Sequence, residues 1–367
     1  MSDQLVQNPW SSKFKGSGKQ RFVFPVIIFF ILLIVGEFYV KWDPYYHKVF
    51  VAAAKHSIGS SIVSGKTDIA PAVGIGAAWH YAVTYFLAIW QALVVGIVVG
   101  AAVQVLLPST WILRLFAKRS FSSVAKAGVM ALPGMMCTCC GAPIAAGLRE
   151  SKASVGSALA FWLGNPVLNP ATIIFMGFVL GWNFALFRIV FGLFLVFGVS
   201  YLADRFTGNK QGENWSMRFT SEKTIDATDL FSDQRPIWMR FFLQVAKMSV
   251  TMLPAYIIVV LLVGGLRAWF FPVLGPHASG LLWLIGLALA GTLFVIPTAA
   301  EVPIVQTLLH FGLGLGPAAA LLLTLPTISA PSIAIVWNAF PKKALFFTAF
   351  ATFLVGIVGG LVGMVVL

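Results

Sequence analysis

The sequence predicts an all-α polytopic membrane protein with two inverted structural repeats, each containing a broken or re-entrant hairpin, plus an extra N-terminal helix. Composition supports the membrane assignment, because 59% of the 367 residues are hydrophobic, 10% are charged, and the mean hydropathy is +0.90. Soluble domains carry roughly 25% charged residues. Most of this surface therefore faces lipid, and the lipid bilayer is an expected partner.

An internal repeat predicts the two-part architecture. Residues 143–173 align without a gap to residues 303–333, at an offset of 160 positions, and nine of the 31 pairs are identical. The pairs that are hardest to obtain by chance are Pro143/Pro303, Gly156/Gly316 and Pro166/Pro326. Proline-interrupted segments at corresponding positions of two membrane halves are typical of the binding region of a secondary transporter.

The membrane-spanning elements follow from segment length, since a helix needs about 20 apolar residues to cross a bilayer. The stretches that satisfy this are 22–40, 79–107, 154–180, 184–203, 240–266, 316–338 and 343–366. Two further apolar stretches, 121–150 and 280–311, are interrupted by proline and glycine. Each of these is either one kinked span or a re-entrant hairpin.

Loop charge favours the hairpins. With hairpins, the basic loops 108–120, 149–152, 204–239 and 341–343 all lie in the cytoplasm, where Lys and Arg are enriched. The first repeat then begins with a helix that enters from outside and the second with a helix that leaves the cytoplasm, so the halves are inverted. Basic residues of cytoplasmic loops also account for the net charge of +13. No nucleic-acid partner is therefore expected.

The expected organisation has four parts. Residues 1–78 form a cytoplasmic tail, the first transmembrane helix and an outer loop; 79–203 form the first repeat; 204–239 form a polar cytoplasmic linker; and 240–367 form the second repeat. Because Lys13, Lys15, Lys19 and Arg21 precede the first apolar run, the N-terminus is predicted to be cytoplasmic. We expect a multi-pass protein of a bacterial inner (plasma) membrane.

The three cysteines of the chain, Cys137, Cys139 and Cys140, fall at the break in the first hairpin. Thiolates suit soft metals, trivalent metalloids and reactive sulfur species. The alternative is that they are small, buried packing residues. Their clustering excludes a disulfide framework, and because no second CxxC or histidine partner is near, no resident metal site is expected.

Polar residues in apolar segments supply the other candidates. Glu301 is the only carboxylate in the second repeat and aligns with Gly141; it is predicted to carry a coupling proton or balance a cationic guest, or to cap a half-helix. Asn165 and Asn169 follow the first hairpin, and Ser329 and Ser332 occupy the matching region of the second repeat. These four contact the guest or form interhelical hydrogen bonds. Arg188 is expected at the outer end of its helix.

Signatures of enzymes are missing from the sequence. It contains no HExxH, GxSxG or Walker motif, so we expect no catalytic residues, no cofactor and no ATP-driven pumping by this chain alone.

Three stretches carry a family resemblance: residues 137–144 (CTCCGAPI), 158–170 (ALAFWLGNPVLNP) and 301–305 (EVPIV). Through them, residues 79–366 resemble the ArsP-like family of predicted permeases. The resemblance implies a permease, and it makes export of trivalent organoarsenicals, the activity of characterised members, a candidate here. The family form of Cys-x-Cys followed by proline is matched by Cys137, Cys139 and Pro143, while Cys140 is additional.

The expected function is that of an inner-membrane permease, a secondary transporter that exports a small thiol-reactive solute such as a trivalent organoarsenical. In this hypothesis Cys139, together with Cys137 or Cys140, holds the small-molecule substrate. The alternatives are a permease of the same fold for a metal ion or a sulfur compound, a membrane thiol or redox sensor without transport, and a passive channel. The sequence leaves open the substrate, the direction, the coupling ion and the oligomeric state, a homo-oligomer included.

Overall fold

The computed structural model describes residues 20–62, 74–207, 236–270 and 280–367, and within these ranges every regular element is helical. Among the described residues, seven helical segments are long and apolar enough to cross a membrane: Val23–Lys55, Ile75–Val105, Val155–Val179, Trp182–Phe206, Ile237–Gly265, Leu315–Val336 and Lys342–Val366. The prediction of an all-α, multi-pass membrane protein is confirmed. The tail before residue 20 and most of the predicted linker 204–239 lie outside the described residues.

The first residues of four helix pairs repeat at the offset of 160 residues seen in the sequence. In the first half these helices are α5 (Phe121–Ala131), α7 (Val155–Val167), α8 (Pro170–Val179) and α9 (Trp182–Leu193). Their counterparts in the second half are α14 (Leu281–Leu293), α16 (Leu315–Thr327), α17 (Ala330–Val336) and α18 (Lys342–Val366). The first half also contains α3 (Ile75–Val105), α4 (Ser109–Phe116) and α10 (Ser200–Phe206), and the second half begins with α12 (Ile237–Gly265), followed by α13 (Arg267–Phe270).

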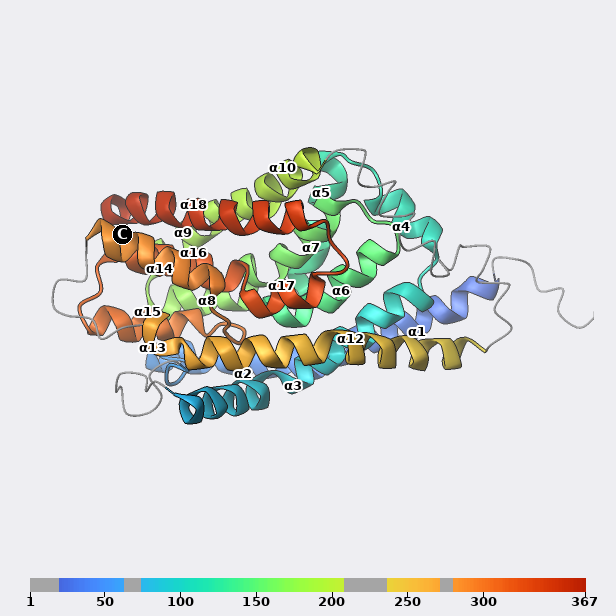
Figure 1. Ribbon diagram of the computed structural model, residues 1–367, viewed down its shortest axis with the longest axis horizontal. Helices are drawn as coiled ribbons and strands as arrows, with labels where there is room; N and C mark the ends of the chain where they lie inside the picture. The colour runs from blue at the N-terminus through green and yellow to red at the C-terminus, as the bar shows by residue number, and fades with distance from the viewer. Residues whose placement is uncertain (1–19, 63–73, 208–235, 271–279) are drawn as a thin grey trace, which may run out of the picture.

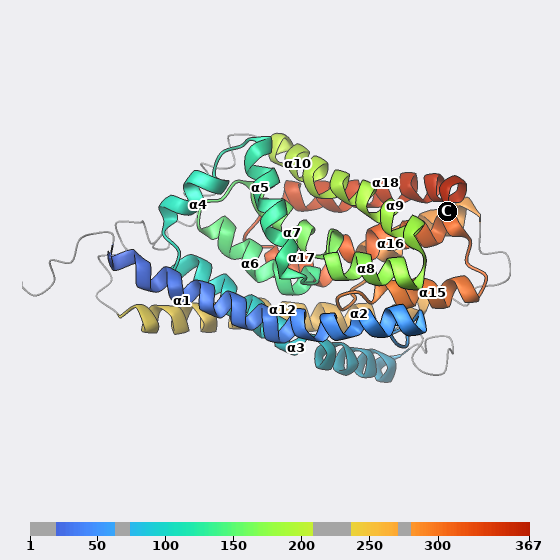
Figure 2. The ribbon, with the colours of Figure 1, turned by 180° about the vertical axis from the view of Figure 1, so that it is seen from behind.

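The helices form two outer walls around an inner layer (Figures 1 and 2). Along one long side lie α3, α12 and the N-terminal helices, and along the opposite side lie α9, α10 and α18. Between them lie the short helices α6 (Thr138–Glu150), α7, α8, α15 (Glu301–His310), α16 and α17. The inner helices are largely buried, with α7 and α16 among the most enclosed.

The N-terminal helix is longer than predicted. It runs through α1 (Gln20–Glu37), a π-helical turn η1 (Phe38–Trp42) and α2 (Asp43–Lys55), whereas the sequence predicted a loop from residue 41. Residues 43–55 are therefore helical, and α2 packs against α8 of the first half. Tyr46, Phe50 and other large apolar side chains remain exposed on this helix, as expected for a surface that contacts lipid.

Both broken stretches consist of two short helices with an irregular connection. In the first, α5 leads through a 3₁₀ turn, η3 (Leu132–Gly134), to α6. In the second, α14 ends at Leu293, and residues 294–297 have no regular secondary structure before α15 begins at Glu301. Left-handed residues mark both connections, Met135 with φ 45° and Ala299 with φ 67°. We call these connections the first tip (residues 132–137) and the second tip (residues 294–300).

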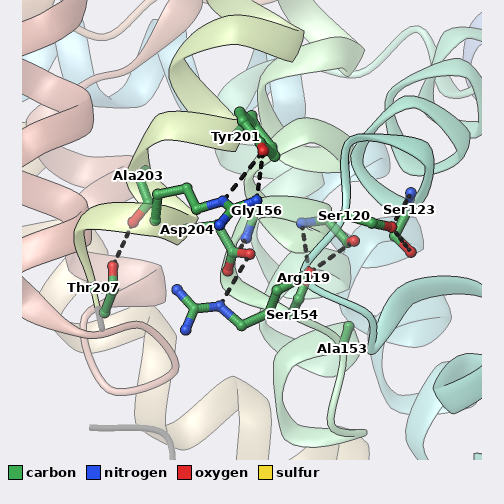
Figure 3. A network of polar contacts seen from close by, with 12 residues as sticks. Arg119, Ser120, Ser123, Ala153, Ser154, Gly156, Tyr201, Ala203, Asp204 and Thr207 are labelled. Carbon is green, nitrogen blue, oxygen red and sulfur yellow. Dashed lines mark hydrogen bonds and ion pairs between the residues drawn. The ribbon is translucent and has the colours of Figure 1, made fainter. Parts of the chain in front are cut away.

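A buried carboxylate ties the helix ends of the first half together (Figure 3). Asp204 on α10 accepts hydrogen bonds from the Gly156 N–H at 3.1 Å and from Arg119 Nε at 3.3 Å. A Cβ at Gly156 would lie 2.8 Å from Asp204 Cβ, so the close approach requires glycine there. Ser154 caps α7 by accepting from the Ser157 N–H at 3.1 Å. This network fixes the start of α7, whose far end reaches the candidate site.

Candidate substrate site

The first tip is shaped by residues that cannot continue a helix. Pro133 lacks a backbone donor, and Gly134 lies so close to Asn165 Oδ1 that a Cβ would collide with it. The chain then enters α6 with Cys137 as the N-cap residue. A proline inside α6, Pro143, leaves the carbonyl of Cys139 without its helical donor. The cysteines therefore lie at the first turn of a helix that starts inside the protein.

Two of the three cysteines form a close pair. The Sγ atoms of Cys137 and Cys140 are 3.1 Å apart, and all three cysteines are free thiols. Their spacing, Cys-x-x-Cys, puts both on one face of the first turn of α6. The separation exceeds the roughly 2.05 Å of a disulfide. Two sulfurs this close can contact one guest atom.

Cys139 faces a different set of groups. Its Sγ accepts a hydrogen bond from Tyr85 Oη at 3.3 Å, and Tyr85 shares a 2.8 Å hydrogen bond with Tyr256. It also lies 4.0 Å from Ser329 Oγ of the second half. Cys139 also interacts with the Cys137 thiol, and its other contacts link it to α3, α12 and α17.

The second tip lies beside the first. Glu301 is the first residue of α15 and is buried. A small cavity is lined by residues of both halves, among them Cys137, Thr138, Thr298, Glu301 and the two matching prolines Pro166 and Pro326. The space open to the centre of a water molecule is about 10 Å³, which is room for about one water.

A buried ion pair closes one side of this cavity. Arg188 on α9 is fully buried, and its Nη2 lies 3.1 Å from Glu301 Oε1. The same guanidinium donates to the carbonyls of Val167 at 2.8 Å, Leu322 at 2.7 Å and Pro166 at 2.8 Å. Arg188, predicted near the outer end of its helix, is thus buried against both halves.

The carbonyls that Arg188 contacts are those that the prolines leave unpaired. Helical N–H groups donate to the carbonyl four residues earlier, so Pro326 frees the carbonyl of Leu322 and Pro170 frees that of Pro166. The N–H of Ala171 donates to Asn169 Oδ1 at 3.0 Å, which frees the carbonyl of Val167. Arg188 therefore donates hydrogen bonds to the unpaired backbone carbonyls of interrupted helices in both halves.

The remaining predicted residues cap the helices beyond the prolines. Asn169 accepts from the N–H groups of Ala171 and Thr172 as the N-cap of α8. Its counterpart Ser329 precedes α17, where Ser332 Oγ accepts from the Ser329 N–H at 3.0 Å. Asn165 Nδ2 donates to Phe161 O at 2.9 Å. Within the described residues, Asn165 Oδ1 and Asn169 Nδ2 are buried without a hydrogen-bond partner.

The N-terminal helix contacts both tips through η1. Trp42 Nε1 donates to the carbonyl of Pro133 in the first tip at 2.7 Å. Lys41 Nζ donates to Thr298 Oγ1 in the second tip at 3.0 Å. Lys41 is buried, and so is Glu37 one turn earlier, whose carboxylate oxygens have no hydrogen-bond partner among the described residues.

Comparison with known proteins agrees with this architecture. The model of a family described as "Predicted permease" (ArsP_1) matches residues 70–165 and 135–366. The chain is 45% identical over 340 residues to UPF0718 protein YraQ of Escherichia coli K12, covering 91% of this chain and 93% of that protein.

The chain belongs to the ArsP-like predicted permease family. UPF0718 protein MJ0584 of Methanocaldococcus jannaschii is a more distant relative, 22% identical over 297 residues that cover 63% of the permease and 79% of MJ0584. No solved structure matches the permease. The resemblance predicted from the sequence motifs is confirmed, and membership supports a general permease role.

The structure brings some of the predicted site residues of the permease together and separates others. Cys137 and Glu301 line one cavity, Cys140 adjoins Cys137, and Cys139 meets Ser329. Asn165 packs on the first tip, and Asn169 and Ser332 act within helix caps. In the part of the chain that the structure describes, no three His, Cys, Asp or Glu side chains gather as a metal site.

Two residues of the site were missed by sequence reasoning, Arg188 and Lys41. Arg188 is the only cation of the apolar stretch 184–203, and intramembrane charges mark functional sites. That signal is present in the sequence for Arg188. Lys41 instead follows the apolar run 22–40 and is close to Asp43 and Lys48, so the sequence predicts a loop there.

Proposed function

We propose that this permease is a secondary transporter that exports a small thiol-reactive solute, such as a trivalent organoarsenical, from the cytoplasm of a bacterium. The observation that carries the proposal is the Cys137–Cys140 pair, 3.1 Å apart at the start of a broken helix between the two halves. Membership of a permease family supports transport. The substrate class rests on the chemistry of the thiols, since trivalent arsenic prefers sulfur ligands.

A singly methylated trivalent arsenical has two exchangeable hydroxyls. When Cys137 and Cys140 each replace one, two As–S bonds form, two As–O bonds break, and each leaving hydroxyl takes the thiol proton away as water. The third bond, to carbon, is untouched. A pair of cysteines therefore suits this guest, and Cys139, which hydrogen-bonds Tyr85, is left outside the pair.

Alternating access follows from the proposed topology. In the proposal the halves are inverted, the two tips are re-entrant hairpins, and the N-terminus is cytoplasmic. Support comes from helix boundaries that repeat at one offset and from α6 packing on α17 while α15 packs on α8. Irregular backbone at membrane depth is tolerated where protein or a water-filled cavity surrounds it. The second tip is mostly buried, and the first tip is buried at Met136 and Cys137 and exposed at Pro133.

Glu301 is the proposed proton-coupling group. Its carboxylate forms an ion pair with Arg188, and the Arg188 guanidinium also donates hydrogen bonds to three backbone carbonyls. Protonation of Glu301 leaves Arg188 on those carbonyls and frees the second tip from the ion pair. Protonation of Glu301 would thus control whether the second tip, which adjoins the guest site, is held by the ion pair.

Uptake of trivalent methylarsenic into everted membrane vesicles under an imposed proton gradient tests the proposal. Cys137→Ser and Cys140→Ser abolish uptake, whereas Cys139→Ser, the matched change one residue away, retains most of it. Glu301→Gln removes the dependence on the gradient. If uptake persists in Cys137→Ser, the pair is not the guest site; if the folded wild type shows none, a trivalent organoarsenical is not the substrate.

A second candidate function is thiol redox sensing, which the Cys-x-x-Cys spacing at the start of α6 favours. Peroxide would oxidise Cys137 and Cys140 to a disulfide, taking two electrons and two protons and leaving as two waters. This function predicts a reversible disulfide and no solute flux in the same vesicles.

A further inference from the structure

The N-terminal helix places a lysine beside the cysteine pair. Lys41 is 7% exposed. Its Nζ donates to Thr298 Oγ1 at 3.0 Å and lies 3.5 Å from Tyr45 Oη. Thr298 lines the same cavity as Cys137, and the ammonium is within electrostatic range of both Cys137 and Cys140.

The backbone of η1 determines where this lysine lies. A π-helical turn shifts the helical register by part of a turn, and such turns are frequent at functional sites. Trp42, the next residue, anchors the turn on the first tip through its hydrogen bond to Pro133 O. The turn is therefore held between the two tips, by Trp42 on the first tip and by Lys41 on the second.

The direct contacts of the Lys41 ammonium are neutral groups, and the Glu37 carboxyl one turn earlier interacts with it at longer range without forming an ion pair. The ammonium contacts two hydroxyls and the ring face of Tyr45, whose centroid is 5.4 Å away. It forms no ion pair with another described residue. The carboxylate of the cavity, Glu301, is already paired with Arg188. A buried charge without a counter-ion is costly, so this environment favours a negative charge nearby.

We propose that Lys41 holds the Cys137–Cys140 pair in its singly ionised form, so that one sulfur is a thiolate before the guest arrives. The thiolate is the reactive form of cysteine. In the first exchange with a trivalent arsenical an S–As bond forms, an As–O bond breaks, and the leaving hydroxide takes the proton of the other thiol as water. The reaction of the thiolate with an arsenical rests on the proposed function. The ionisation of the cysteine pair by Lys41 does not.

Other titratable groups face the pair or Lys41 from the surrounding helices. They are Glu37 of α1, Tyr45 and Lys48 of α2, Tyr85 of α3, Cys139 of α6, Tyr256 of α12, and the Arg188–Glu301 ion pair of α9 and α15. Lys41 and Lys48 form no ion pair with another described residue, and Lys41 is the one that interacts with the cysteine pair. Cys139 also interacts with Cys137, so the effect of Lys41 is measured in a background without Cys139.

The pH dependence of thiol alkylation tests this proposal. Full-length protein carrying Cys139→Ser is purified in detergent, and reaction of the pair with iodoacetamide is followed by mass spectrometry across a pH series. Lys41→Met moves the midpoint of the rate profile to higher pH and slows the reaction near neutral pH about tenfold. Lys41→Arg keeps the profile of the parent protein. Lys55→Met, at the exposed end of α2, is the matched control and leaves it unchanged.

The midpoint and the plateau of the profile report different properties. The midpoint reports ionisation of the pair, and the plateau at high pH reports access to it. An unchanged midpoint in Lys41→Met overturns the proposal, including the case in which only the plateau falls, because Lys41 then acts in packing alone. A shifted midpoint together with absent arsenical uptake by the parent protein supports this inference and contradicts the proposed function.

Discussion

At the scale of single residues, the site depends on prolines and on the cation that compensates for them. Pro170 and Pro326 leave backbone carbonyls unpaired at the centre of the protein. Arg188 donates to the carbonyls of Pro166 and Leu322 and pairs with Glu301. One side chain thereby joins the broken helices of both halves to the second tip.

Replacing Arg188 tests this role. Arg188→Met leaves a buried carboxylate and three carbonyls without donors, so we expect the free energy of unfolding to fall by about 3–5 kcal/mol. Thermal and denaturant unfolding in detergent micelles measures the change. Arg205→Met is the control, because Arg205 is an exposed residue that hydrogen-bonds Tyr201 on its own helix, and it should change stability by less than about 0.5 kcal/mol. Equal effects of the two substitutions would contradict the assignment.

At the scale of elements, each half contains a helix that stops inside the protein and a second that starts there. α5 and α6 meet at the first tip, and α14 and α15 meet at the second. The C-cap residues of α6 and α15 are Ser151 and Phe311, which are related by the offset of the repeat. If the halves are inverted, these two matched positions lie on opposite sides of the membrane.

Side-specific labelling tests the inversion. Single cysteines are introduced as Ser151→Cys or Phe311→Cys in a background without Cys137, Cys139 and Cys140. An impermeant maleimide is then added to intact spheroplasts or to everted vesicles. We expect Ser151→Cys to react from the cytoplasmic face and Phe311→Cys from the outer face. Reaction of both positions from the same face would show that the halves are parallel and that the hairpin topology is wrong.

Sequence patterns predicted most of these elements because apolar length and proline spacing are local properties. The seven spans, the two breaks and the 160-residue offset all follow from such patterns. The extension of the first helix to Lys55 did not, since Lys41, Asp43 and Pro44 are typical of a loop. In the structure Pro44 is tolerated in the first turn of α2, and Lys41 is stabilised by contacts with the second tip.

The site was predicted only in part, for a physical reason. The cysteines and Glu301 were identified because rare polar residues at a break are conspicuous in an apolar chain. Which cysteines pair depends on side-chain directions in the first turn of α6, which spacing alone leaves open between Cys137, Cys139 and Cys140. The partners of Arg188 are 21 to 134 residues away in the chain, and no local pattern specifies such contacts.

At the scale of the whole molecule, three parts meet at one small cavity. The first half contributes Cys137, whose thiol pairs with Cys140, and the second half contributes Glu301 and Thr298. Lys41 of the N-terminal helix donates a hydrogen bond to Thr298. The family match begins at residue 70, so the helix that carries Lys41 precedes the matched region. The central claim is that Cys137 and Cys140 together bind one thiol-reactive guest at this junction.

Counting bound arsenic tests that claim most directly. Purified full-length protein is incubated with trivalent methylarsenic, freed of unbound reagent, and examined by native mass spectrometry. The wild type and Cys139→Ser should each retain one arsenic per chain, with loss of two free thiols, and Cys137→Ser and Cys140→Ser should retain none. One arsenic retained by Cys137→Ser but lost in Cys139→Ser would contradict the claim and place the guest at Cys139.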